Sequence, residues 1–208
     1  IKLVKKIYKQ DRIIGVVTQK NIKTDDPGFN DLYRVGTVAH IIKMLVLPDG
    51  NTTIIIRGKK RFEIQEELQS NPYFTAKVRT LEENFPKKGN KKTSALISSI
   101  QETAQKILKL NPEIPKEAQV ALNNIESPSF LIHFLSSNIS ADVSDKQKLL
   151  ELQDGVDRAT LLLEYMLKEV KMLELKQEIH TKVSTDIDQQ QRDFYLRQQI
   201  KVLQDELG

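Results

Sequence analysis

The sequence contains no cysteine. A disulfide framework and a thiolate metal site are therefore excluded, and a chain without cysteine fits a reducing compartment, so we expect a cytoplasmic location. Long apolar runs are lacking as well, because no stretch approaches the roughly 20 consecutive apolar residues that span a bilayer. The opening IKLVKKIYK interleaves lysine with apolar residues too often to form the core of a signal peptide. We expect a globular protein with no contact to a membrane.

Catalytic motifs are also lacking. The sequence has neither the G-x-S-x-G elbow that exposes a nucleophilic serine nor the G-x-x-x-x-G-K-[ST] loop that cradles phosphate. No second ligand stands at metal spacing from His40, His133 or His180, for which structural roles are expected. The acidic pair Glu82 and Glu83 is expected to be solvated at a strand end. We therefore expect neither an enzyme active site nor a metal site in this chain.

Charge is distributed unevenly along the 208 residues, which suffice for one large domain or two small ones. Residues 1–92 carry 19 Lys and Arg against 10 Asp and Glu, whereas the remaining residues carry 13 against 18. A basic half can indicate nucleic-acid binding. Here the lysines are scattered or lie in GKKR (58–61) and PKKGNKK (86–92), with no nucleic-acid module around them. A solvated surface is the favoured interpretation, and nucleic-acid binding is the weaker one.

The first half of the chain has the pattern of a short helix followed by strands. Residues 1–8 have helical amphipathic spacing. Segments rich in β-branched residues then follow at residues 12–19, 37–47, 52–58, 61–68 and 74–81. The sequences PDGN (48–51) and GKKR (58–61) are typical of turns, so an antiparallel meander is predicted. The polar segment 24–36 is predicted to be an unusually long loop.

The second half has helical periodicity. Helices are predicted at residues 94–110, 115–125, 127–139 and 144–154. Ser127 and Ser144 are expected to be N-caps. Between Val156 and Leu207 there is neither glycine nor proline, which predicts one helix of roughly 80 Å at about 1.5 Å per residue. Its broad apolar stripe ends near Leu175, and the part from about Val183 onward is expected to project into solvent.

These patterns predict an α+β protein in four parts. A β-rich subdomain at residues 1–86, with a twisted antiparallel sheet or pseudo-barrel, is joined by a linker at 87–92 to an all-α bundle at 93–155. A long exit helix at 156–208 completes the chain.

Two long motifs resemble one protein family. The run PGFNDLYRVGTVAHIIKMLVLPDGNTTIIIRGKKRFEI (27–64) resembles the amino-terminal domain of the ATP-dependent Lon proteases. The closing RDFYLRQQIKVLQDELG (192–208) resembles the helix that precedes the ATPase module in that family. The likeness spans essentially the whole chain. The family pattern also begins earlier, with an apolar strand and a Pro-containing segment that this sequence does not contain.

The resemblance implies a domain for substrate recognition and assembly. In such proteases the amino-terminal domain captures unfolded or damaged proteins, an AAA+ ATPase ring of six subunits unfolds them with ATP and Mg²⁺, and a Ser-Lys dyad cleaves them. No Walker or dyad motif lies in this chain, so no cofactor and no catalysis are expected here. The alternative is a stand-alone LON-type β-domain that binds a small ligand or effector. It accounts for residues 1–86 and leaves the long helix without a purpose.

The projecting helix is the first candidate site. Ile187, Phe194 and Tyr195 are expected to contact unfolded polypeptides, because unpaired apolar side chains on a solvated helix can bury area against them. Ile187 and Phe194 are seven residues apart and so share one face. The competing interpretation is that these residues pack against a neighbouring subunit or the ATPase.

The long loop is the second candidate site. It is predicted to form a weaker contact region together with basic residues near the start of the chain. The members are Phe29, Leu32, Tyr33, Lys2, Lys5 and Lys6. The competing interpretation is that Phe29 and Leu32 close one end of the sheet.

The end of the helix is assigned to assembly. Ile200, Leu203 and Leu207 repeat at coiled-coil-like spacing, but the polar stretch 186–193 breaks the heptads. We therefore expect the chain alone to associate weakly, and the seam to pair neighbouring helices in a full-length hexamer.

Overall fold

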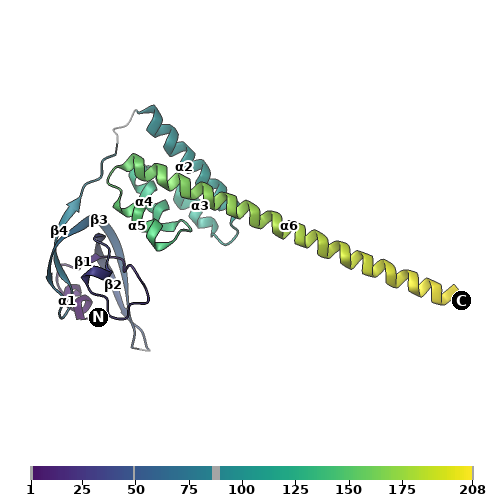
Figure 1. Cartoon of the computed structure of the whole chain (residues 1–208), viewed down its shortest axis with the longest axis horizontal. Helices are drawn as coiled ribbons and strands as arrows, with labels where there is room; N and C mark the ends of the chain where they lie inside the picture. The colour runs from purple at the N-terminus through teal and green to yellow at the C-terminus, as the bar shows by residue number, and fades with distance from the viewer. Residues whose placement is uncertain (1, 49, 86–89, 208) are drawn as a thin grey trace.

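The computed structural model describes residues 2–48, 50–85 and 90–207. It consists of a sheet with a short helix, a helical bundle, and one helix that runs far beyond the bundle (Figure 1). The α+β architecture predicted from the sequence is confirmed. Half of the predicted linker at 87–92, namely residues 87–89, lies outside the described part of the chain.

The sheet is a four-stranded antiparallel meander that follows helix α1 (Lys2–Tyr8). Its strands, in the order β1-β2-β3-β4, are β1 (Ile13–Val16), β2 (Val35–Val46), β3 (Thr52–Gln69) and β4 (Thr75–Leu81). The long loop between β1 and β2 contains a 3₁₀ turn at Phe29–Asp31. Strand β1 pairs only with the segment Thr37 to His40 of β2. The rest of β2 is therefore an open edge in the described structure.

The turn predicted at 58–61 is wrong, because β3 continues through GKKR without interruption. Val38 pairs with Lys60 and Ala39 with Gly58, which leaves Lys59 as the extra residue of a bulge. A bulge bends a strand without ending it. The glycine and lysines of GKKR, a sequence typical of turns, are therefore accommodated inside a strand. Strands β2 and β3 pair antiparallel on either side of the turn predicted at 48–51, as expected for a hairpin, with Gly50 at φ 84°. Asp49 of that turn lies outside the described residues.

Within the described residues, five helices follow the sheet. They are α2 (Lys91–Leu110), α3 (Lys116–Asn123), α4 (Pro128–Asn138), α5 (Val143–Glu151) and α6 (Gly155–Leu207). The Ser127 cap is confirmed, since its side chain accepts a hydrogen bond from the Phe130 backbone N–H. The prediction of Ser144 as an N-cap is wrong. Helix α5 begins at Val143, and Asp142, whose backbone is extended, is its N-cap. Ser144 therefore lies inside the helix.

The main hydrophobic core lies between the helices. Helices α2 and α6 lie side by side, and α4 and α5 pack beneath them (Figure 1). The core comprises Ile100, Ala104, Ile107, Leu122, Leu131, Ile132, Ile139, Leu149, Ala159, Leu162, Met166 and Val170. The members from α6 recur every three or four residues, as expected for one buried face of a helix.

Helix α6 leaves the bundle earlier than the sequence suggested. Its last buried residue is Val170, and every described side chain from Glu174 to Glu206 is exposed. Leu175, which was expected to be covered, is exposed. Helix α2 packs along α6 and ends at Leu110, so α6 loses this neighbour beyond that point. The projecting part therefore begins about ten residues before Val183.

Candidate functional site

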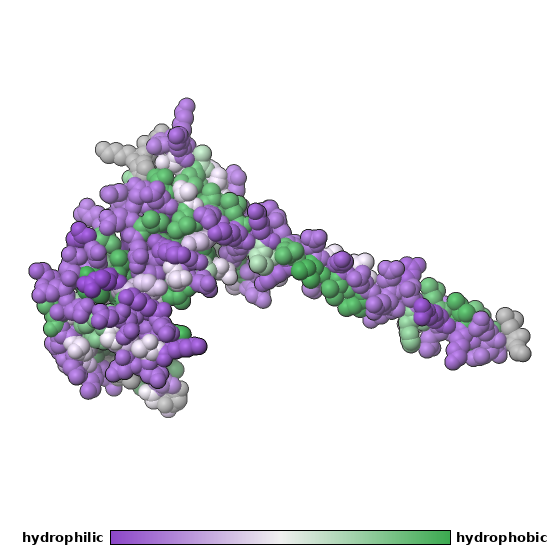
Figure 2. All heavy atoms as spheres, in the orientation of Figure 1, coloured by the Kyte–Doolittle hydropathy of each residue, from purple (hydrophilic) through white to green (hydrophobic). Residues whose placement is uncertain are grey.

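The projecting part of α6 carries an apolar stripe. Met172, Leu175, Ile179, Val183 and Ile187 follow one another at spacings of three or four and are all exposed. Figure 2 shows this band on the visible face, then a hydrophilic stretch, then a second apolar group toward the C-terminal end. Contiguous exposed apolar surface on a folded chain marks an interaction site.

The second apolar group contains the two aromatic residues singled out in the sequence. Phe194 is 62% exposed and Tyr195 is 72% exposed. With Gln190 and Gln191 they border a hollow of about 260 Å³ on the helix surface. Ile187 lies two turns earlier, at the end of the first band. The structure therefore places all three predicted contact residues on α6, and no other described element covers them.

The residues assigned to assembly lie at the end of the same helix. Ile200 and Leu203 are exposed, as is their neighbour Val202. The side chain of Leu207 lies outside the described part of the structure.

The residues of the long loop differ among themselves. Leu32 is only 8% exposed and pairs with Gln19 in an isolated β-bridge, so its side chain is packed inside the subdomain. The ring of Phe29 lies 4.7 Å from that of Phe74, centroid to centroid. Tyr33 is half-buried. At this loop the structure favours packing for Leu32 and leaves part of Phe29 and Tyr33 accessible.

The lysines of α1 border the same subdomain. Lys2 and Lys5 are exposed. Lys6 is engaged, because its ammonium group donates a 2.7 Å hydrogen bond to the Tyr73 hydroxyl and lies 5.4 Å from that ring's centroid.

A polar cluster joins the sheet to the bundle, and the sequence analysis missed it. The Glu83 carboxylate, which follows β4, accepts hydrogen bonds from Ser129 and Arg158 and lies 3.0 Å from Nε2 of His133. The expectation that Glu83 is solvated is therefore wrong. Burial acts to raise the pKa of Glu83, but the hydrogen bonds from His133 and Ser129 and the charges of His133 and Arg158 outweigh it, lowering the pKa to about 2.

Two buried arginines extend this junction. The side chain of Arg61, from β3, donates to the carbonyls of Leu150 and Leu152 at 2.8 and 2.7 Å. Arg158, from α6, donates to those of Leu149 and Leu152. These carbonyls end α5 and lack partners within the helix, so the guanidinium groups satisfy them and oppose the negative end of the helix dipole. The two arginines tie the sheet, α5 and α6 into one unit.

The electrostatics of the junction reflect this burial. Arg61 is 5% and Arg158 1% exposed. Burial lowers the pKa of Arg61 to about 10, with a further contribution from the charge of Arg158 and opposition from Glu83. A sequence signal did exist: Arg158, Leu162 and Met166 are spaced by four, which places a charge on the apolar face of α6. Arg61 gave no such signal, since it lay within an apparent turn.

A glycine allows α6 to start against the sheet. The backbone N–H of Gly155 donates to the carbonyl of Asn84 at 2.9 Å. A Cβ at Gly155 would lie 2.3 Å from a ring carbon of Phe85, so a larger residue cannot fit without a shift. The direction of the projecting helix is therefore set by contacts at its first turn.

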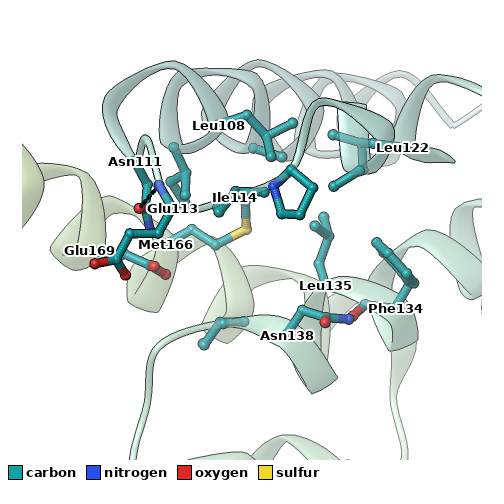
Figure 3. Close-up of a pocket in the computed structure, with 15 residues that line it drawn as sticks. Leu108, Asn111, Glu113, Ile114, Leu122, Phe134, Leu135, Asn138, Met166 and Glu169 are labelled. Atoms are coloured by element: carbon teal, nitrogen blue, oxygen red, sulfur yellow. Dashed lines mark hydrogen bonds between the residues drawn. The ribbon is translucent and has the colours of Figure 1, made fainter. Parts of the chain in front are cut away.

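A cavity of about 460 Å³ opens between α2, α3, α4 and α6 (Figure 3). Its walls are mainly apolar, with polar groups at the ends. The residues that line it include Asn111, Glu113, Leu122, Asn138, Met166 and Glu169. Among residues 2–48, 50–85 and 90–207 no group of three or more His, Cys, Asp or Glu could hold a metal ion. No helix in that same part of the chain is long and apolar enough to cross a membrane.

A meander sheet tied to a helical bundle with a long exit helix defines a class of domain found in solved structures. The Lon N-terminal domain protein of Xanthomonas campestris matches with a TM-score of 0.55 and 17% identity, covering 79% of this chain and 82% of the other. The N-terminal domain of the Mycobacterium avium complex Lon protease also matches with a TM-score of 0.55, at 16% identity, covering 74% and 89%. These likenesses show the fold.

The family follows from the sequence comparisons. The model of the ATP-dependent protease La (LON) substrate-binding domain matches residues 1–168, and this chain belongs to that family. The chain is 63% identical over all 208 residues to the Lon protease of Cytophaga hutchinsonii and 46% identical to that of Flavobacterium johnsoniae. It spans about a quarter, 26%, of the length of each. It is thus an amino-terminal Lon domain, matching the resemblance recognised in its motifs.

Proposed function

We propose that this chain captures unfolded or damaged proteins for the ATPase and protease parts of a Lon protease. The observation that carries the proposal is the projecting part of α6, where every described side chain from Glu174 to Glu206 is exposed and two apolar groups face solvent. Unfolded polypeptides expose apolar side chains of their own. Each Å² of apolar surface that both partners bury contributes roughly 25 cal/mol to the free energy of binding. A few such contacts therefore hold a segment reversibly.

The contact residues of this proposal are Ile187, Phe194 and Tyr195, with Phe29 and Tyr33 as a second, weaker region. Lys2 and Lys5 supply positive charge beside that second region. Lys6 contributes as well, although its ammonium group already donates a hydrogen bond to the Tyr73 hydroxyl. Leu32, which is only 8% exposed, supports the region by packing beneath it.

The same helix serves assembly in the proposed full-length protein. Ile200, Leu203 and Leu207 would pair neighbouring helices once six ATPase modules hold them at high effective concentration. ATP and Mg²⁺ act in that ATPase, the Ser-Lys dyad acts in the protease part, and the whole protein works in the cytoplasm. The β-domain acting by itself on a small ligand is less well supported, because Arg61 ties the sheet to α5.

Photo-cross-linking of an unfolded, fluorescent polypeptide tests the capture surface. We expect Ile187→Ser/Phe194→Ser to lower the yield of adducts severalfold relative to wild type. The matched control is Val120→Ser/Val143→Ser, which removes two equally exposed apolar residues from α3 and α5. Equal adduct yields from all three proteins, at unchanged helicity by circular dichroism, would remove α6 from the binding model.

A further inference from the structure

The cavity in the helical bundle has the properties of a binding site for one kind of side chain. Its volume of about 460 Å³ falls within the roughly 300–1,000 Å³ of ligand sites. Leu122 from α3 and Leu135 from α4 point toward each other across it, and Met166 lies between them and α6 (Figure 3). The space therefore accommodates a bulky apolar group, and the flexible Met166 thioether can adapt to its shape.

Two amides in the cavity wall keep unused hydrogen-bonding groups. The Asn111 side-chain oxygen accepts a hydrogen bond from the Glu113 backbone N–H at 3.1 Å. The Asn138 amide nitrogen donates to the Phe134 carbonyl at 2.7 Å. Within the described residues the Asn111 NH₂ and the Asn138 carbonyl remain without partners. An amide NH₂ and an amide carbonyl are thus available to polar backbone groups of a bound segment.

One end of the cavity is acidic. Glu113 and Glu169 lie together at that end (Figure 3). Glu169 accepts a 3.3 Å hydrogen bond from the Ser140 backbone N–H, but in the described part of the chain neither carboxylate forms an ion pair with a cation. Other acidic residues on the same helices do pair, as Glu174 does with Lys106 at 2.6 Å. Two uncompensated negative charges beside an apolar cavity repel an acidic ligand and attract a basic one.

We infer that this cavity binds a polypeptide segment in which a bulky apolar side chain stands next to Lys or Arg. The apolar side chain fills the cavity, the two asparagine amides bond the backbone beside it, and the cationic group pairs with Glu113 and Glu169. The inference rests on the proposed function, since it names the class of segment that the captured proteins must present. It adds a site in the bundle, separate from the exposed face of α6.

Short fluorescent peptides measure the selectivity. Three peptides carry, at their centre, Phe flanked by Lys, Phe flanked by Glu, or Ser flanked by Lys. By fluorescence anisotropy at low salt, we expect the chain to bind the first about 3- to 10-fold more tightly than the second, since partly exposed ion pairs contribute modestly. The third peptide should bind more weakly still, because nothing fills the cavity. A benzoyl-phenylalanine version of the first peptide should cross-link to Met166.

Two variants separate this inference from the proposed function. Glu113→Gln/Glu169→Gln should abolish the preference for Lys over Glu, while Glu102→Gln/Glu126→Gln, with the same change of charge elsewhere, should retain it. Ala118→Phe, which fills the cavity from α3, should remove Met166 adducts.

The outcomes are distinct. Unchanged preference in Glu113→Gln/Glu169→Gln, with continued capture of unfolded protein through α6, overturns the cavity inference alone. Failure of wild type to bind any of the polypeptides overturns the proposed function as well. Equal binding of the free amphiphile phenethylamine and the first peptide shows that the cavity takes small cations, which also overturns the inference.

Discussion

Glu83 should make the stability of the junction between sheet and bundle depend on pH in the acid range. Its pKa is lowered in the folded chain from an ordinary 4.5 to about 2. The carboxylate form therefore stabilises the fold in full above about pH 5, and that contribution is lost as the pH falls toward 2. A difference of about 2.5 in pKa sets an upper limit of about 3 kcal/mol. Because 24% of the side chain is exposed, solvent screening reduces the expected loss to about 1–2 kcal/mol.

The measurement is urea unfolding between pH 6 and pH 2.5, for wild type and Glu83→Gln. The variant should be less stable than wild type at pH 6 by about 1–3 kcal/mol, because the buried Arg158 loses its carboxylate partner while the carbonyls of α5 remain. Its stability should also depend less on pH. Hydrogen exchange at the Gly155 amide, which bonds Asn84, reports opening of this junction directly.

Asp145→Asn serves as the control. The pKa of Asp145 is also lowered, by hydrogen bonds from Lys148 and Tyr165, yet these partners lie on α5 and α6 and neither belongs to the Glu83 cluster. That variant should keep the Glu83 contribution and the exchange protection of Gly155. If wild type and Glu83→Gln have the same pH dependence and the same protection, the junction does not stabilise the fold through this carboxylate.

Further predictions concern packing and assembly. Gly155→Ala should destabilise the chain by about 1–3 kcal/mol in thermal melts, since the added Cβ meets the Phe85 ring; an unchanged melting temperature would show that the first turn of α6 shifts freely. Leu32→Ser should cost several kcal/mol and Phe29→Ser clearly less, because only Leu32 is buried; equal losses would assign both residues to the end of the sheet. By sedimentation the 208-residue chain should be mainly monomeric at micromolar concentration, whereas Leu203→Asp should weaken hexamers of the ATPase-linked protein; a tight hexamer of the chain alone would contradict the assignment.

Local signals in the sequence account for most of the elements. The hairpin at 48–51 was predictable because glycine provides the positive φ that its turn needs. Helix α4 was predictable from Ser127 and the proline after it. The full length of α6 followed from the absence of glycine and proline after Val156. Each of these features depends on residues within a few positions of one another, and the same is true of the motifs that placed the chain in its family.

Other features depend on partners distant in the sequence. The segment GKKR (58–61) is part of strand β3 because β2 pairs along it. Lys59 is accommodated there as the extra residue of a bulge. Glu83 became a partly buried anchor because α4 and α6 bring His133 and Arg158 to it, 50 and 75 residues further along. The exposed part of α6 begins where α2 ends, and the cavity exists only where four helices diverge. The sequence by itself thus determined which elements form. Only the tertiary structure decided which of their faces are buried, because burial depends on the lengths and crossings of neighbouring elements.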